Sequence, residues 1–127
     1  MRKLLILFVL ALCACSDNLT REELAALAAK GYYTHLAAGE YEQFLEGKAG
    51  SDSLPDDYRS QLIAVYRQFH DRQQRDHGGI SEVRVSTART DSLLPYTNAF
   101  LILCFADSMQ EEVVVPMVEH DGRWKMK

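Results

Sequence analysis

The chain has 127 residues and a formal net charge of −4, with an apolar share of 47% and a charged share of 25%. This length and composition predict one globular domain, so neither a two-domain protein nor a disordered chain is expected. The acidic balance argues against nucleic acid as a partner and against a basic surface that holds anionic lipid, because both depend on Lys and Arg.

Residues 1–14 have the features of a signal peptide. Arg2 and Lys3 precede eleven uncharged, mostly apolar residues that end at Ala14. That run is too short to span a bilayer, which needs about 20 residues, but it fits the apolar region of a leader. Removal of Arg2 and Lys3 would leave 12 basic and 18 acidic residues, a net charge of −6.

The leader ends in Leu12-Cys13-Ala14-Cys15, which is similar to a lipobox. We therefore expect cleavage before Cys15 and attachment of acyl chains such as palmitate, which together anchor a protein firmly to a membrane. Cys13 is unusual at its position, and ordinary secretion without lipid is the alternative. Ser16 resembles a sorting signal that favours the outer membrane over the inner membrane of the cell envelope.

One thiol would remain unmodified in the mature chain, that of Cys104, so no intrachain disulfide is expected. A nucleophile paired with a histidine is one interpretation. Cys104 lies in the apolar run 100–105, and this favours the alternative of a small buried hydrophobic residue.

Three helices are expected in the first half of the domain. Thr20 and Glu23 form a capping-box pattern that starts a helix extending to about Ala38. Its predicted apolar stripe consists of Leu24, Leu27, Ala28, Gly31 and His35. A short second helix would bury Tyr41, Phe44 and Leu45 and end near Gly47.

The third helix is expected to begin at Pro55, whose fixed φ suits a first turn, and to end at Gly78-Gly79. Its spacing predicts a buried stripe of Tyr58, Leu62, Val65 and Phe69, followed by solvated turns.

The apolar period then changes from 3.6 to 2 and predicts four strands. The side chains of residues 80–89 alternate in polarity, with Val83, Val85 and Thr87 on one side of the strand. Residues 97–106 are expected to form a central strand that is covered on both faces. Residues 111–119 contain Pro116, which implies an edge or a bulge. Asp121-Gly122 predicts a hairpin into a last strand, with Trp124 and Met126 on one side.

The predicted fold class is α+β, with the helices packed on one face of a curved four-stranded antiparallel meander. The expected organisation is a signal peptide (1–14), a lipidated tether (15–19) and a single domain (20–127).

Several segments resemble small bacterial lipoproteins of unknown function with a cystatin-like fold, near the nuclear-transport-factor-2-like superfamily. They are the leader, Gly31-Tyr32-Tyr33, Gly39-Glu40-Tyr41, Leu54-Pro55 and the segment from Val113 to Lys125. The resemblance implies a cone-shaped α+β domain. Members of the superfamily include isomerases, dehydratases, hydrolases and non-enzymatic binding modules, and some relatives are labelled lumazine-binding. The fold alone therefore does not select a function.

Enzymes of that superfamily use a carboxylate base and a Tyr or Asp acid inside the cone. The candidates to line such a pocket here are Tyr32, His35, Tyr41, Cys104, Met117 and Trp124. A His35–tyrosine pair facing a pocket is one hypothesis. Aromatic core residues with satisfied polar tips are the favoured alternative.

No catalytic residue, metal site or cofactor is assigned from the sequence. His70, Gln74 and His77 share one helical face, but Gln is a poor ligand and the stretch is rich in charge, which favours a solvated face. No phosphate-binding glycine loop, nucleophile elbow or Cys-x-x-Cys pair is present.

Two functional hypotheses follow. The first is a non-catalytic envelope module that binds a small ligand, a glycan or an envelope protein, with homodimer formation left open. The second is a small isomerase or hydrolase that uses a pocket in the cone. An open cone with a buried carboxylate facing a tyrosine would favour the enzyme, whereas a cone filled by side chains such as Phe100, Ile102, Leu103, Met117 and Trp124 would favour the module.

Overall fold

The computed structural model describes residues 18–127, so the predicted signal peptide and Cys15 lie outside the described residues. The helices are α2 (Arg21–Ala37), α3 (Tyr41–Glu46), a 3-10 turn η2 (Ser51–Ser53) and α4 (Asp56–His77). The strands are β1 (Ile80–Thr90), β2 (Thr97–Phe105), β3 (Gln110–His120) and β4 (Arg123–Met126), paired antiparallel in the order β1-β2-β3-β4. The predicted α+β meander is confirmed.

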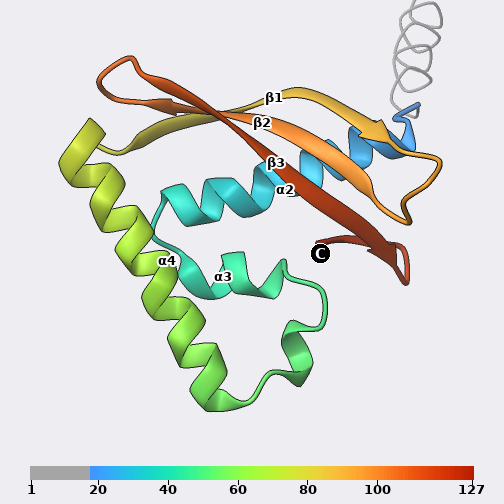
Figure 1. The fold of residues 1–127 in the computed structure, drawn as a ribbon, viewed down its shortest axis with the longest axis horizontal. Coiled ribbons are helices and arrows are strands. Elements are labelled where there is room, and N and C mark those ends of the chain that lie inside the picture. Colours follow the sequence, from blue (N-terminus) through green and yellow to red (C-terminus); the bar gives the residue numbers. More distant parts are fainter. Residues whose placement is uncertain (1–17) are drawn as a thin grey trace, which may run out of the picture.

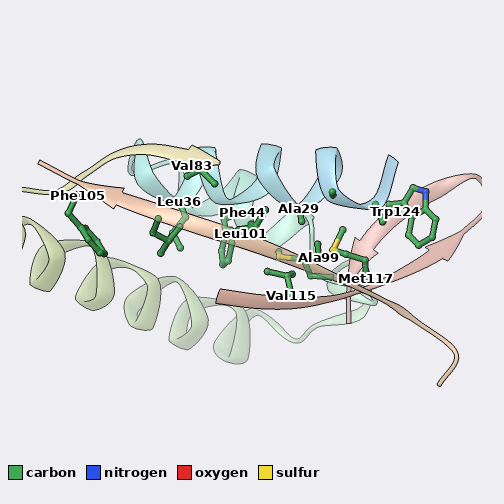
Figure 2. Close-up of a cluster of buried hydrophobic side chains, with 14 residues drawn as sticks. Ala29, Leu36, Phe44, Val83, Ala99, Leu101, Phe105, Val115, Met117 and Trp124 are labelled. Atoms are coloured by element: carbon green, nitrogen blue, oxygen red, sulfur yellow. The ribbon is translucent and has the colours of Figure 1, made fainter. Parts of the chain in front are cut away.

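Helix α2 lies against one face of the curved sheet, and α3 and α4 form a further layer beyond it (Figure 1). The face that carries α2 is called the inner face here, and the opposite one the outer face. The core fills the space between α2 and the inner face (Figure 2). Within residues 18–127, no helix has the length and apolarity needed to cross a membrane.

Helix α2 begins where the capping pattern predicts, because the Thr20 hydroxyl accepts a hydrogen bond from the Glu23 amide at 3.1 Å. The predicted apolar stripe was mostly wrong, although Ala28 packs against the core as predicted. Leu24 and Leu27 are exposed, and the buried face is formed instead by Ala25, Ala26, Ala29 and Leu36. Large side chains on the inner face, such as Leu101 and Met117, leave room only for small residues on the helix that approaches them.

Helix α4 starts after Pro55 and ends at Gly78, whose φ of 75° forms the left-handed cap that the Gly-Gly pair predicted. The predicted buried stripe was correct at Phe69, which packs against the core, and wrong at two other positions. Tyr58 and Val65 are exposed and no residue of α4 is fully buried, because the helix packs at the margin of the domain. Tyr66 and Phe69 are the side chains that reach the core.

Strand β1 departs from regular alternation. Its register with β2 shifts between Val85 and Thr87. Because of this shift, Ala88 lies on the inner face, whereas regular alternation had predicted Thr87 at that side. Val83 is buried, but Val85 is exposed.

Strand β2 is central, as predicted, but only its inner side is covered. Ala99, Leu101 and Leu103 are fully buried, whereas Phe100 and Ile102 are half-buried on the outer face. The expectation that this strand is covered on both faces was therefore wrong at Phe100 and Ile102.

Strands β3 and β4 form the expected tight hairpin, with Asp121 and Gly122 at φ of 52° and 77°. Residue pairing between them ends at Met117, and the Lys127 amide makes one further bond to the Pro116 carbonyl at 2.8 Å. Pro116 therefore lies where the edge of β3 begins to be free, a position that tolerates the missing N–H of proline. Trp124 and Met126 both face the core, as predicted.

Candidate functional site

A cleft of about 170 Å³ lies between the helices and the sheet near the free edge of β3. It is lined by Tyr33, Phe44, Lys48, Tyr66, Val114, Val115, Pro116, Met126 and Lys127. None of these is a carboxylate or a histidine. The isomerase or hydrolase hypothesis needs a positioned base in a pocket, and the titratable side chains that line this cleft are two phenols and two lysines.

An aromatic cluster closes the same region from the helical side. The ring of Phe44 contacts Tyr33 at 5.2 Å and Tyr66 at 4.8 Å between centroids, both edge to face. Such pairs contribute about 0.5–1.5 kcal/mol each beyond their burial. Burial raises the pKa of both Tyr33 and Tyr66, and a neighbouring tyrosine raises each further. Both therefore stay neutral and act as core residues.

The three pocket candidates on the helices are held by separate partners. The Tyr32 hydroxyl donates to the Trp124 carbonyl at 2.6 Å, so its polar tip is satisfied within the fold. His35 lies near the end of α2 with Nδ1 2.9 Å from the Glu40 carboxylate, and both side chains are substantially exposed. Tyr41 packs edge to face with His70 at 5.8 Å. No cavity joins these residues.

The three candidates on the strands are also dispersed. Met117 is fully buried on the inner face. Trp124 is buried near the start of α2, with the Arg21 guanidinium 5.2 Å above its ring. Cys104 is buried, as expected, but it belongs to the outer face beside Glu82 and Gln110. The six candidates therefore do not surround a common pocket.

The two histidines of α4 have different environments. His70 Nε2 lies 3.2 Å from the Ala37 carbonyl. His77 Nδ1 lies 2.7 Å from Asp107, and its ring stacks on Phe105 at 4.6 Å. The hydrogen bond from His77 holds the pKa of Asp107 below its ordinary value, with a smaller contribution from the Met109 amide. Across residues 18–127, no group of three or more His, Cys, Asp or Glu side chains is placed to hold a metal ion.

A larger cavity, of about 680 Å³, opens between the loop after α3 and the β3–β4 hairpin. We call it the polar cleft. It is lined by Lys48, Ala49, Gly50, Ser51, Asp52, Val118, Glu119, His120, Asp121, Arg123 and Lys125. The loop is fastened to β4 by two backbone hydrogen bonds of 2.7 Å, from the Ala49 amide to the Met126 carbonyl and from the Met126 amide to the Gly47 carbonyl. The cleft therefore has fixed walls.

Charge in the polar cleft is unevenly satisfied. Glu119 pairs with Arg21 at 3.0 Å, and Asp121 lies 3.3 Å from His120 Nε2, a contact that is an ion pair only when the imidazole is protonated. Among residues 18–127, Lys48 and Arg123 have no ion-pair partner, and neither has Asp52 on the same lining. The Lys125 ammonium donates to the carbonyl of Glu46 at 2.9 Å. Two basic side chains of an acidic protein are thus available to a ligand.

Sequence reasoning missed this cleft. One signal for it was present, because Arg123 and Lys125 are two residues apart in a strand and must share a face. Lys48 joins them only through the tertiary contact between its loop and β4. That contact could not be read from local patterns.

No family model matches the sequence, and no curated protein matches it. Among solved structures, the chain is similar to the crystal structure of a Campylobacter jejuni protein that carries the provisional name of NTF2-like transpeptidase. The TM-score is 0.63 at 13% sequence identity, over 77% of this chain and 92% of that one. This similarity shows that the chain has an NTF2-like fold, with N-terminal helices packed on a four-stranded antiparallel meander.

Proposed function

We propose that this protein is a lipid-anchored module of the cell envelope that binds a ligand in the polar cleft and catalyses no reaction. The observation that carries the proposal is the contrast between two cavities. The cleft near the free edge of β3 is small and its lining has no carboxylate or histidine side chain, whereas the larger polar cleft presents Lys48 and Arg123 at the surface. Attachment through Cys15, with the outer membrane as the favoured location, rests on the leader pattern.

The charges of the polar cleft favour an anionic ligand that also carries hydroxyl groups. Arg123 presents a planar fork of donors that suits a carboxylate or a phosphate, and Lys48 adds a second cation. Asp52 and His120 provide polar partners for hydroxyls. Acidic saccharides of the envelope combine these features, so we propose them as the ligand class.

The name of the Campylobacter jejuni protein suggests peptide-bond chemistry for that protein. Such chemistry, like the isomerase or hydrolase alternative, needs a nucleophile or a base that can reach a substrate. Cys104 is the thiol among the described residues, and it is buried with 8% of its surface exposed. Binding is therefore the function that the described residues support best.

The test is calorimetric titration of the chain from residue 16 with galacturonate oligomers as the acidic probe and chitobiose as the neutral one. We expect binding of the acidic probe alone. Lys48→Gln and Arg123→Gln should each weaken it about tenfold or more, because a charged hydrogen bond contributes about 1.5–3 kcal/mol.

Arg72→Gln, on an exposed turn of α4, is the matched control and should bind like the wild type. Equal affinity in all three variants would contradict the site. Chemical conversion of a probe, detected by mass spectrometry, would instead support the enzyme alternative.

A further inference from the structure

Exposed apolar side chains gather at one end of the domain. Ten large apolar residues among residues 18–127 are substantially exposed, and six of them belong to the segment just before α2, the first half of α2, the middle of β1 and the β1–β2 loop. These six are Leu19, Leu24, Leu27, Val85, Leu93 and Leu94. Single exposed leucines are ordinary, whereas a gathered set marks a contact surface. We call this set the N-terminal apolar surface.

Part of this surface is a groove of about 530 Å³ between α2 and the free edge of β1. Leu19, Leu27 and Val85 line it together with Ala26 and Ala88. No lysine or arginine lines the groove, and its charged residues are Glu22 and Glu23. Its partner must therefore be recognised by apolar contact and not by negative charge.

The β1–β2 loop displays a leucine by means of a hydrogen-bonded turn. The Asp91 carboxylate accepts from the Leu93 amide at 2.9 Å, and the Asp91 carbonyl accepts from the Leu94 amide at 3.2 Å. Leu93 is 88% exposed. The turn fixed by these two hydrogen bonds directs the Leu93 side chain outward, away from the core.

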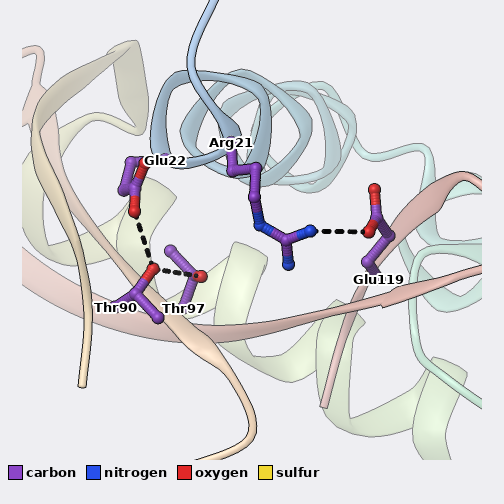
Figure 3. A network of polar contacts seen from close by, with 5 residues as sticks. All are labelled: Arg21, Glu22, Thr90, Thr97 and Glu119. Carbon is purple, nitrogen blue, oxygen red and sulfur yellow. Dashed lines mark hydrogen bonds and ion pairs between the residues drawn. The ribbon is translucent and has the colours of Figure 1, made fainter. Parts of the chain in front are cut away.

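Polar contacts hold this loop beside the start of α2 (Figures 1 and 3). The Thr90 hydroxyl donates to Glu22 at 2.9 Å and also lies 2.8 Å from the Thr97 hydroxyl. On the other side, Arg21 pairs with Glu119 at 3.0 Å. The base of the β1–β2 loop is therefore fastened to the start of α2.

We infer that the N-terminal apolar surface rests on a phospholipid bilayer, an inference that relies on the proposed lipid anchor. Leu19 is four residues from Cys15, and four residues span at most about 14 Å. An acyl chain inserted through Cys15 would thus hold this end of the domain at the membrane surface. Leucines at the acyl–headgroup boundary then lose contact with water, as in proteins that lie on a membrane.

The test is fluorescence quenching with a tryptophan reporter. Lipidated protein carrying Leu93→Trp would be placed in phosphatidylethanolamine–phosphatidylglycerol vesicles with brominated acyl chains. Val65→Trp, at an exposed position of α4, is the matched control, and wild-type emission from Trp124 is subtracted from both. We expect several-fold stronger quenching at residue 93 than at residue 65, unchanged by high salt. Equal quenching at the two positions would overturn the inference.

Failure of the anchor is a separate outcome. The intact mass of the native protein reports whether Cys15 is acylated, and an unmodified thiol would refute the anchor on which the inference relies. The same reporters can then be held on nickel-chelating vesicles through an N-terminal hexahistidine tag at residue 16. Selective quenching at residue 93 on these vesicles would still support contact between the N-terminal apolar surface and the bilayer. Equal quenching at residues 93 and 65 would refute that contact as well as the anchor.

Discussion

Strand β4 separates two regions with opposite properties. Trp124 and Met126 point under the sheet and are buried, whereas Arg123 and Lys125 point into the polar cleft. The two-residue period of a strand thus assigns alternate positions to packing and to solvent. The comparison indicates that stability is concentrated beneath the sheet and that binding belongs to the surface, and the predictions below test that division.

The largest effect is expected for a truncation beneath the sheet. Leu101→Ala should lower the free energy of unfolding by about 2–5 kcal/mol, because Leu101 is fully buried between α2 and the inner face (Figure 2). Urea denaturation measures this loss in the free energy of unfolding. Leu93→Ala, at the most exposed leucine, should remain close to the wild type. A small loss for Leu101→Ala would mean that this region is not the tightly packed core described.

A smaller loss is expected at the boundary between the two regions. A Cβ at Gly47 would lie 2.4 Å from the ring of Tyr32, whose hydroxyl is fixed on the Trp124 carbonyl. Gly47→Ala should therefore cost about 1–3 kcal/mol through overpacking.

Gly31→Ala is the matched comparison, because a Cβ there meets no atom within 4 Å and Gly31 is helical. It should stabilise the protein by up to about 1 kcal/mol. Thermal unfolding of the two variants decides the point, and a stabilised Gly47→Ala protein would contradict the Tyr32 contact.

The smallest effect concerns pH at the end of α4. The hydrogen bond from His77 lowers the pKa of Asp107 in the folded state, so its stabilising contribution is present above the unfolded pKa of about 4 and is lost as pH falls below it. Asp107→Asn removes that dependence. The free energy of unfolding of the variant should decline less steeply than that of the wild type between about pH 5 and pH 3. If the free energies of unfolding of the two proteins decline in parallel, the hydrogen bond between His77 and Asp107 does not contribute to the pH dependence of folding.

The sequence predicted the elements better than it predicted their faces. Caps and turns at Thr20, Gly78 and Asp121-Gly122 depend on local hydrogen bonds and backbone conformation, so their positions could be read directly. The buried side of α2 could not, because it is chosen by the bulk of the opposing strands. The expected stripe began with Leu24 and Leu27, which are exposed, and of its members Ala28 packs against the core. The fully buried positions of α2 are Ala25, Ala26, Ala29 and Leu36.

The candidate site was predicted less well than the fold. The six residues proposed to line a pocket were selected by chemical type, and separate partners hold them in the structure. The polar cleft depends on Lys48, which a loop brings to the edge of β4 from about 75 residues earlier in the chain. Local periodicity carries no information on such a contact.

The most direct test of the division between packing and binding is an amide NMR titration of the chain from residue 16 with galacturonate oligomers. We predict that shift changes concentrate at Gly50, Arg123 and Lys125 and leave the amides of Tyr33 and Tyr66 unchanged. Changes concentrated at Tyr33, Tyr66 and Met126 would place the ligand beneath the sheet and contradict the account.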